Sequence, residues 1–191
     1  KVLKAYISDE NHYDVSEGVE KVELTLEIED EANVENYYFL TLRTVTKTDT
    51  SYYQSYPEFT FNDPIFDEGD FSEEFLEIEE FLNPQAQYDR SVTFTDELFE
   101  GQQKSLKLYI RKDALEGLIF DPNEDVLVPA ERTAYFIIGS MSRELYLYKR
   151  SALSQSRISE NPFAEAVRVY NNIEGGVGIF GGFVQDTVFV E

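Results

Sequence analysis

Apolar and polar residues alternate along the stretch Val22 to Asp30 (VELTLEIED). This pattern places four apolar side chains on one face, namely Val22, Leu24, Leu26 and Ile28. Alternation with a period of two is typical of a half-buried strand, most often an antiparallel one. Tyr37 to Thr46 (YYFLTLRTVT) is rich in aromatic and β-branched residues and predicts a second strand. Because residues 31–36 between them are polar and turn-like, we expect the two strands to form a hairpin or meander pair.

The next forty residues are less regular. Residues 52–61 are aromatic but interrupted by Pro57, which favours an edge strand or an irregular crossing over a central strand. Residues 62–70 contain Asp-Pro and Glu-Gly pairs and predict a loop. Residues 71–82 carry apolar residues at mixed spacing, so the pattern allows either a short helix or an acidic strand.

The second half returns to strand patterns around a single helical segment. Strands are expected at 91–95, 105–111, 133–138, 166–170 and 183–190, with a turn at Gly101 and an irregular stretch between Pro122 and Pro129. Residues 140–156 favour an α-helix, because apolar residues recur on one face at Met141, Leu145, Tyr148 and Ala152. The fold class that follows is mainly β: an antiparallel β-sandwich or barrel with one packed α-helix at about 140–156.

Composition supports one folded domain over residues 1–191. The chain is 42% hydrophobic and 15% aromatic, enough for a single core in a domain of this length. It contains no cysteine, which excludes disulfides, thiolate metal sites and cysteine nucleophiles.

The strong negative charge excludes some classes of binding partner. The net charge is −22, from 16 Lys and Arg against 38 Asp and Glu. Nucleic acid is therefore not an expected partner, since binding to phosphates depends on cationic side chains. An anionic membrane surface would repel the chain, and no apolar run is long enough for direct membrane insertion.

A glycine motif near the C-terminus matches the pattern of a dinucleotide-binding turn. Gly176, Gly178 and Gly181 fit G-x-G-x-x-G, but that chemistry requires a helix directly after the glycines. Residues 183–190 favour a strand instead. We therefore expect a glycine-rich turn and no cofactor there.

One loop has part of a calcium-binding pattern. Asp121, Asn123 and Asp125 alternate as oxygen ligands do in the first half of a calcium loop. Val126 and Arg132 stand where that loop requires a glycine and a bidentate acid, so the alternatives are a non-standard Ca²⁺ site and an exposed acidic loop.

Catalytic machinery is not evident, and we do not expect an enzyme. His12 is the only histidine, lies in a polar stretch, and has no serine elbow motif to act with, so a surface position is expected. Two of the many acids could meet glycosidase spacing by chance, but no pair is singled out.

Three tyrosines are the strongest candidates for an exposed binding surface. Tyr52, Tyr53 and Tyr56 occur in the irregular segment, where loops more often carry function. Exposed tyrosines serve protein interfaces and stack on sugar rings.

Several stretches together resemble a known family. They are Asn36 to Tyr38, Val92 to Gly101 (VTFTDELFEG), Leu145 to Tyr148, and above all Asn161 to Gly182, which ends in NNIEGGVGIFGG. These stretches resemble an uncharacterised family of Bacteroidota outer-membrane lipoproteins, the domain of unknown function 4249. The resemblance covers most of the chain but only the later part of the family's usual length.

The resemblance implies a location and a role. Members are often encoded beside TonB-dependent outer-membrane receptors and begin with a lipoprotein signal and a further β-rich region. It implies that residues 1–191 are the C-terminal part of a longer precursor, held at the cell surface by a lipid anchor on its N-terminus. The expected function is a non-catalytic accessory or partner of an outer-membrane β-barrel receptor complex or of other surface proteins. The alternative is a glycan- or peptide-binding surface module, with or without calcium.

Overall fold

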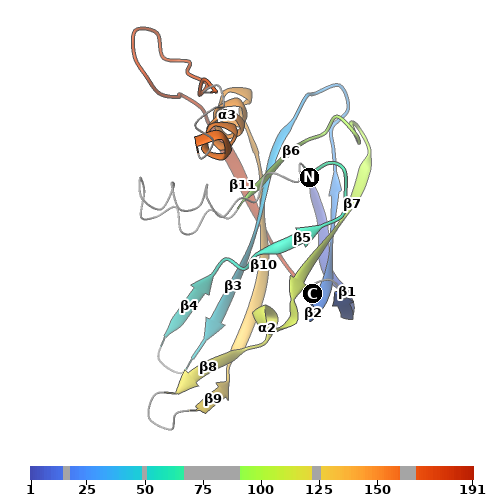
Figure 1. Cartoon of the computed structure of the whole chain (residues 1–191). Coiled ribbons are helices and arrows are strands. Elements are labelled where there is room, and N and C mark those ends of the chain that lie inside the picture. Colours follow the sequence, from blue (N-terminus) through green and yellow to red (C-terminus); the bar gives the residue numbers. More distant parts are fainter. Residues whose placement is uncertain (15–17, 49–50, 67–90, 122–125, 160–166) are drawn as a thin grey trace.

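The protein is a sandwich of two antiparallel β-sheets with one long helix across one end (Figure 1). The structure, a computed structural model, describes residues 1–14, 18–48, 51–66, 91–121, 126–159 and 167–191. Among the described strands the sheets do not close into a barrel, which decides between the two expected architectures. The segment 71–82, expected to be a helix or a strand, lies outside the described residues.

The first sheet contains four strands in the order β1-β2-β7-β5. Their bounds are β1 Val2–Asp14, β2 Val19–Glu29, β7 Gln103–Arg111 and β5 Phe59–Phe61. The predicted alternation within β2 is confirmed, because Val22, Leu24, Leu26 and Ile28 all lie in the core and the side chains between them face away from it. Strand β1 was not predicted, since only Ala5 is buried among those of its side chains that the structure describes.

The second sheet contains five strands in the order β11-β10-β3-β4, with β6 also paired to β3. Their bounds are β11 Phe183–Phe189, β10 Glu131–Met141, β3 Tyr37–Lys47, β4 Tyr52–Ser55 and β6 Val92–Thr95. Strand β10 is a central strand of this sheet, because it pairs with β3 over its whole length and with β11 over seven residues.

The main core fills the space between the sheets. Leu24 and Leu26 from the first sheet meet Leu40 and Leu42 from the second, and all four are fully buried. Phe94 of β6 lies among them and is 1% exposed. Burying such side chains stabilises the fold by roughly 1.5–3 kcal/mol each.

The expected hairpin between residues 22–30 and 37–46 is wrong. Strand β2 pairs with β1 and β7, whereas β3 pairs with β10, β4 and β6, so the two strands belong to opposite sheets. Residues 30–36 turn the chain from one sheet to the other. Alternation identified the buried face of each strand, but it cannot tell strands that pair from strands that face one another across a core.

The segment around Pro57 is both an edge strand and a crossing, as expected. Strand β4 lies at the edge of the second sheet and β5 at the edge of the first, with Pro57 between them. Two other expectations are wrong. Residues 126–129 form strand β9 (Val126–Pro129), which pairs with β8 (Leu118–Asp121), and residues 167–170 are not a strand.

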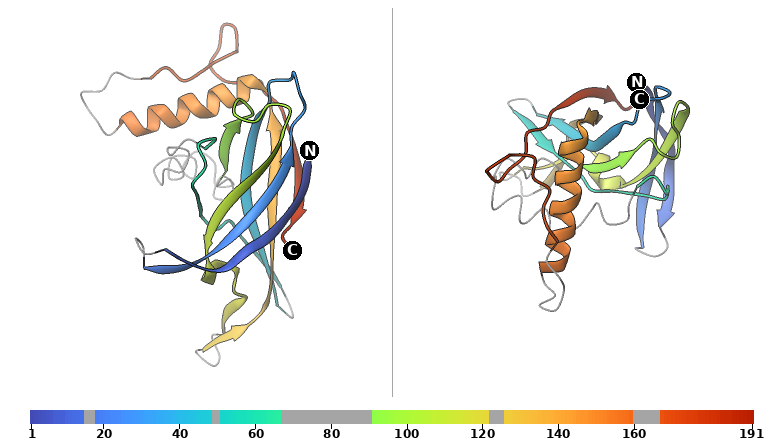
Figure 2. Two further views of the ribbon diagram at one scale, coloured as in Figure 1. Left: turned by 90° about the vertical axis from the view of Figure 1, so that its right-hand side faces the viewer. Right: turned by 90° about the horizontal axis from the view of Figure 1, so that it is seen from above.

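The expected helix is confirmed with its bounds moved to Arg143–Ser159 (α3). It begins later because Ser140 and Met141 complete β10, and the hydroxyl oxygen of Ser142 accepts a hydrogen bond from Leu145 N at 3.4 Å. A short helix, α2 (Lys112–Leu115), follows β7. Figure 2 shows α3 running across the strand direction at one end of the second sheet.

A second, smaller apolar cluster lies beneath α3 on the outer face of the second sheet, opposite the core. Its buried members are Tyr37, Phe39, Ile137 and Met141, with Tyr56, Leu145 and Tyr146 packed against them. The rings of Tyr37 and Tyr146 are 4.8 Å apart, which ties the helix to the sheet. Strand β3 is therefore apolar on both faces.

Candidate functional site

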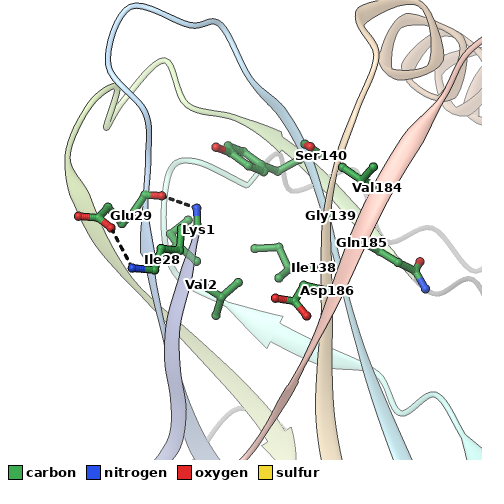
Figure 3. Close-up of a pocket in the computed structure, with 11 residues that line it drawn as sticks. Lys1, Val2, Ile28, Glu29, Ile138, Gly139, Ser140, Val184, Gln185 and Asp186 are labelled. Atoms are coloured by element: carbon green, nitrogen blue, oxygen red, sulfur yellow. Dashed lines mark hydrogen bonds and ion pairs between the residues drawn. The ribbon is translucent and has the colours of Figure 1, made fainter.

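The two sheets join along one edge and separate farther along it. Ala5 of β1 forms a parallel bridge with Val190, and Ile7 N donates to the Glu191 carbonyl at 3.0 Å. Beyond this junction β1 and β11 diverge around a pocket of about 250 Å³ (Figure 3). Lys1 and Val2 lie on one side of it and Gln185 and Asp186 on the other, with Ile138 toward its floor (Figure 3). We call this the seam pocket.

A larger pocket of about 390 Å³ lies on the outer face of the second sheet, beside α3. Its floor is formed by the smaller apolar cluster, through Phe39, Ile137 and Met141. Its polar groups are Thr41, Arg43, Lys149 and Gln185, and the remaining lining residues are Tyr56, Leu145 and Phe183. We call this the outer-face pocket.

Arg43 is the unusual residue of the outer-face pocket. Its Nε is buried and has no hydrogen-bond partner among the described residues. Its guanidinium carbon lies 5.3 Å from the ring centre of Tyr135, a cation–π distance. Arg43 was not predicted as a site residue, although its position on the same face of β3 as Tyr37 and Phe39 was a signal in the sequence.

The charge of the outer-face pocket is opposite to that of the protein. Among the residues that the structure describes, it is lined by Arg43 and Lys149 and by no carboxylate, although 38 of 191 residues are acidic. An apolar floor with a few polar groups is typical of small-molecule sites. The arrangement can hold an apolar group and an anionic group at once.

The loop 171–182 is organised by two asparagine side chains. Asn171 Oδ1 accepts hydrogen bonds from Ile173 N at 3.1 Å and Gly178 N at 3.0 Å. Asn172 pairs with the backbone of Phe180 in both directions, accepting and donating at 2.7 Å. Gly175 and Gly178 have φ of 72° and 145°, so the loop needs glycine at both positions. No helix follows these glycines, since β11 begins at Phe183.

This loop and β11 expose a run of apolar side chains. Of fifteen large hydrophobic residues exposed among the described residues, six fall within 173–189: Ile173, Val177, Phe180, Phe183, Val184 and Phe189. Val177 is 99% exposed and Phe180 83%. We call these six residues the C-terminal apolar surface, although Phe183 lines the outer-face pocket and Val184 lines the seam pocket, on opposite faces of β11. The glycines predicted a turn, but the exposure of the apolar residues between them was not predicted.

The structure separates the three candidate tyrosines. Tyr52 and Tyr53 are adjacent on β4, so they point to opposite faces of the strand, and both are exposed. Tyr56 packs against the smaller apolar cluster and lines the outer-face pocket. The three do not form one platform.

The candidate calcium ligands are only partly within the described residues. Asp121 ends strand β8, whereas Asn123 and Asp125 lie outside the described residues, so calcium binding there stays a prediction. No group of three or more His, Asp or Glu side chains that could hold a metal ion occurs in the described part of the chain. His12 lies on β1 with its ring 4.7 Å from that of Tyr109.

A buried polar network fixes the corner between β2 and β3. Asp30 accepts hydrogen bonds from the hydroxyl of Tyr38 and from Gly101 N. Asp96 Oδ2 accepts from Asn36 N at 2.8 Å and from Asn36 Nδ2 at 3.1 Å. Burial raises the pKa of Asp96 and of Tyr38. Because the carboxylates are occupied by backbone and side-chain donors, this network serves the fold.

The stretches that carry the family resemblance meet in space. Asn36–Tyr38 and Val92–Gly101 meet in the corner network, and β6 pairs with β3 there. The helix residue Leu145 lies against the glycine loop, where a Cβ on Gly181 would be 2.9 Å from Leu145 Cβ. The resemblance therefore follows contacts that define the fold.

No helix within the described residues has the length and apolar character needed to cross a membrane. Neither the curated proteins nor the solved structures contain a match to this chain. Residues 3–188 match the family described as Domain of unknown function (DUF4249). Since the match covers nearly the whole chain, the protein belongs to the DUF4249 family.

Proposed function

We propose that this domain is a non-catalytic binding component that docks onto an outer-membrane receptor of the TonB-dependent type at the bacterial cell surface. In this proposal it is a lipid-anchored lipoprotein of the Bacteroidota. The observation that carries the docking role is the C-terminal apolar surface, where Val177 and Phe180 stand almost fully in solvent. Exposed apolar groups of this kind are typical of protein interaction sites.

The organisation of the loop supports a docking role. Side-chain hydrogen bonds from Asn171 and Asn172 hold the loop in one shape before any partner arrives. Preorganisation lowers the entropic cost of binding. Aromatic side chains such as Phe180 and Phe183 are enriched in the centres of protein interfaces.

Charge favours a protein over a lipid surface as the occupant. Residues 171–191 contain Glu174, Asp186 and Glu191 and no Lys or Arg. An apolar segment that binds anionic membranes normally carries cations beside its apolar groups. A receptor surface with an apolar hollow and a basic rim fits this segment better.

The test is a native pull-down from the source membrane with the full chain and two double variants. Val177→Ser with Phe180→Ser removes the apolar tip, and Tyr13→Ser with Leu98→Ser removes exposed apolar groups elsewhere. We expect the first variant to lose an outer-membrane β-barrel protein that wild type and the second variant recover. Equal recovery by all three, or no barrel partner with any, would contradict the proposal.

A lipid arm of the same experiment separates the two kinds of surface. Flotation with vesicles of anionic phospholipid should leave the wild-type chain unbound. Flotation that depends on Val177 and Phe180 would replace the receptor by a membrane as the occupant.

A second candidate function is glycan or peptide binding at β4. Tyr52 and Tyr53 are 69% and 59% exposed, which fits ring stacking on a sugar or peptide. A glycan array tests this function. The array is read with and without Ca²⁺, because the candidate calcium loop at 121–125 could contribute to binding when Ca²⁺ is present. Binding that disappears in Tyr52→Ala and Tyr53→Ala supports this function, and a blank array removes it for glycans.

A further inference from the structure

We infer that the outer-face pocket binds a small organic anion, a molecule with an apolar or aromatic body and a single carboxylate. The site is separate from the C-terminal apolar surface in its chemistry, although Phe183 borders both. The inference does not depend on the proposed receptor.

The apolar half of the ligand is indicated by the floor of the pocket. Phe39, Ile137 and Met141 are each less than a tenth exposed and present an apolar surface from two neighbouring strands. Tyr56 and Phe183 add aromatic walls, and Phe183 meets Phe39 edge-on at 5.7 Å. A ring or short alkyl chain would bury its surface there at about 25 cal/mol per Å².

The anionic half is indicated by Arg43. The Nε of Arg43 is buried and has no hydrogen-bond partner among the described residues, so this atom has lost hydration without replacing it. The Tyr135 ring offsets part of this cost, but a ring supplies no hydrogen-bond acceptor. A carboxylate would supply two acceptor oxygens in the geometry that guanidinium prefers.

The charges that line the pocket indicate that it prefers an anionic ligand. Lys149 of α3 brings a second cation to the wall, and no Asp or Glu from the described part of the chain lines the pocket. In a chain of net charge −22, this leaves a locally cationic, partly apolar site on an acidic protein. The acidic surface would attract cations, whereas the pocket would attract and hold anionic ligands.

The size of the pocket limits the ligand. A volume of about 390 Å³ lies within the usual range for small-molecule sites. It suits a molecule such as 4-phenylbutyrate, which we choose as the probe, and its neutral amide is the matched comparison. The two differ only in the group that would meet Arg43.

The first measurement is calorimetric titration of the full chain with both probes. We expect 4-phenylbutyrate to bind at least about tenfold more tightly than 4-phenylbutyramide. Arg43→Gln should reduce the affinity for the acid to that for the amide, and Lys149→Gln should weaken it less. Lys47→Gln is the control, because it removes a cation from the same strand outside the pocket and should change nothing.

A second Arg43 variant and a methyl label in the pocket test the binding site independently. Arg43→Lys keeps the charge without the planar fork and should bind with intermediate affinity, so the result does not rest on one variant. Met141 is the single methionine of the chain and lines the pocket, so a ¹³C-methyl label there reports binding directly. The resonance of this methyl group is assigned by its loss in Met141→Leu. When 4-phenylbutyrate is added, the resonance should shift in wild type and shift far less in Arg43→Gln. Equal affinity for acid and amide, an unchanged Arg43→Gln, or no binding of the acid would each overturn the inference.

Discussion

The backbone nitrogen of Asn36 donates a hydrogen bond to Asp96 Oδ2 at 2.8 Å, which joins two segments sixty residues apart. The same carboxylate oxygen accepts from Asn36 Nδ2 at 3.1 Å. Asp96 is 3% exposed, so water cannot replace it. This pair holds the turn that carries the chain from the first sheet to the second.

Removing this carboxylate should therefore destabilise the fold. Asp96→Ala leaves the half-buried Asn36 amide without its acceptor, and we expect a loss of about 1–3 kcal/mol in the free energy of unfolding. Asp96→Asn keeps one oxygen and should cost less. Urea unfolding measures both, with the exposed neighbour variant Glu97→Ala as control. If Asp96→Ala lowers the free energy of unfolding no more than Glu97→Ala does, Asp96 has no structural role in this turn.

Stability should depend on pH through Glu23 on the outer face of the first sheet. A hydrogen bond from Lys107 is the largest cause that lowers the pKa of Glu23 below its usual 4.5, with Ser8 and Tyr109 also donating. A lowered folded-state pKa stabilises the protein above the unfolded pKa, and this stabilisation is lost as pH falls through the folded value.

The matching variant is Glu23→Gln. We expect wild type to exceed it in unfolding free energy at about pH 7 and the difference to shrink by about pH 3. Urea unfolding at both pH values measures it, and Glu174→Gln in the exposed loop is the control. A difference that stays constant between the two pH values would refute the linkage.

Gly139 should not tolerate a side chain. A Cβ there would lie 2.2 Å from the Val184 carbonyl oxygen and 2.4 Å from the ring of Phe39. Gly139→Ala must shift β11 or the floor of the outer-face pocket, and we expect a loss of about 1–3 kcal/mol. Thermal unfolding tests this against Thr187→Ala on the exposed part of β11. Equal melting temperatures of the two variants would mean that the close approach is not maintained.

The shape of the loop 171–182 should depend on Asn171. We expect Asn171→Ala to speed amide hydrogen exchange at Ile173 and Gly178 by about tenfold, because both amides donate to its side chain. The melting temperature should stay close to that of wild type, since the loop is outside the core. Exchange measured by NMR, with Glu174→Ala as control, decides the point. Unchanged protection at both amides would mean that the backbone alone holds the loop.

The predictable part of the fold was the burial pattern within single strands. The alternation of Val22, Leu24 and Leu26 identified the core face of β2 because side chains alternate regularly along a strand. Pro57 identified a break between two edge strands for an equally local reason. The pairing of β2 with β7 was not predictable, since it joins residues about eighty positions apart.

The candidate site was less predictable because it depends on neighbours in space. Tyr56 was singled out as a binding residue, but the cations that line the same pocket, Arg43 and Lys149, come from β3 and α3. One signal was available: Tyr37 and Phe39 make the second face of β3 apolar, which indicates a strand covered on both sides. Nothing local distinguishes the exposed Phe180 from a buried one.

The most direct test of the docking role is photo-crosslinking in the source membrane. A photoreactive phenylalanine analogue replaces Phe180, and the same analogue replaces the exposed Tyr13 on the opposite sheet as control. The proposed function requires a covalent adduct with an outer-membrane β-barrel protein from position 180 and none from position 13. No adduct from position 180, or the same adduct from both positions, would contradict it.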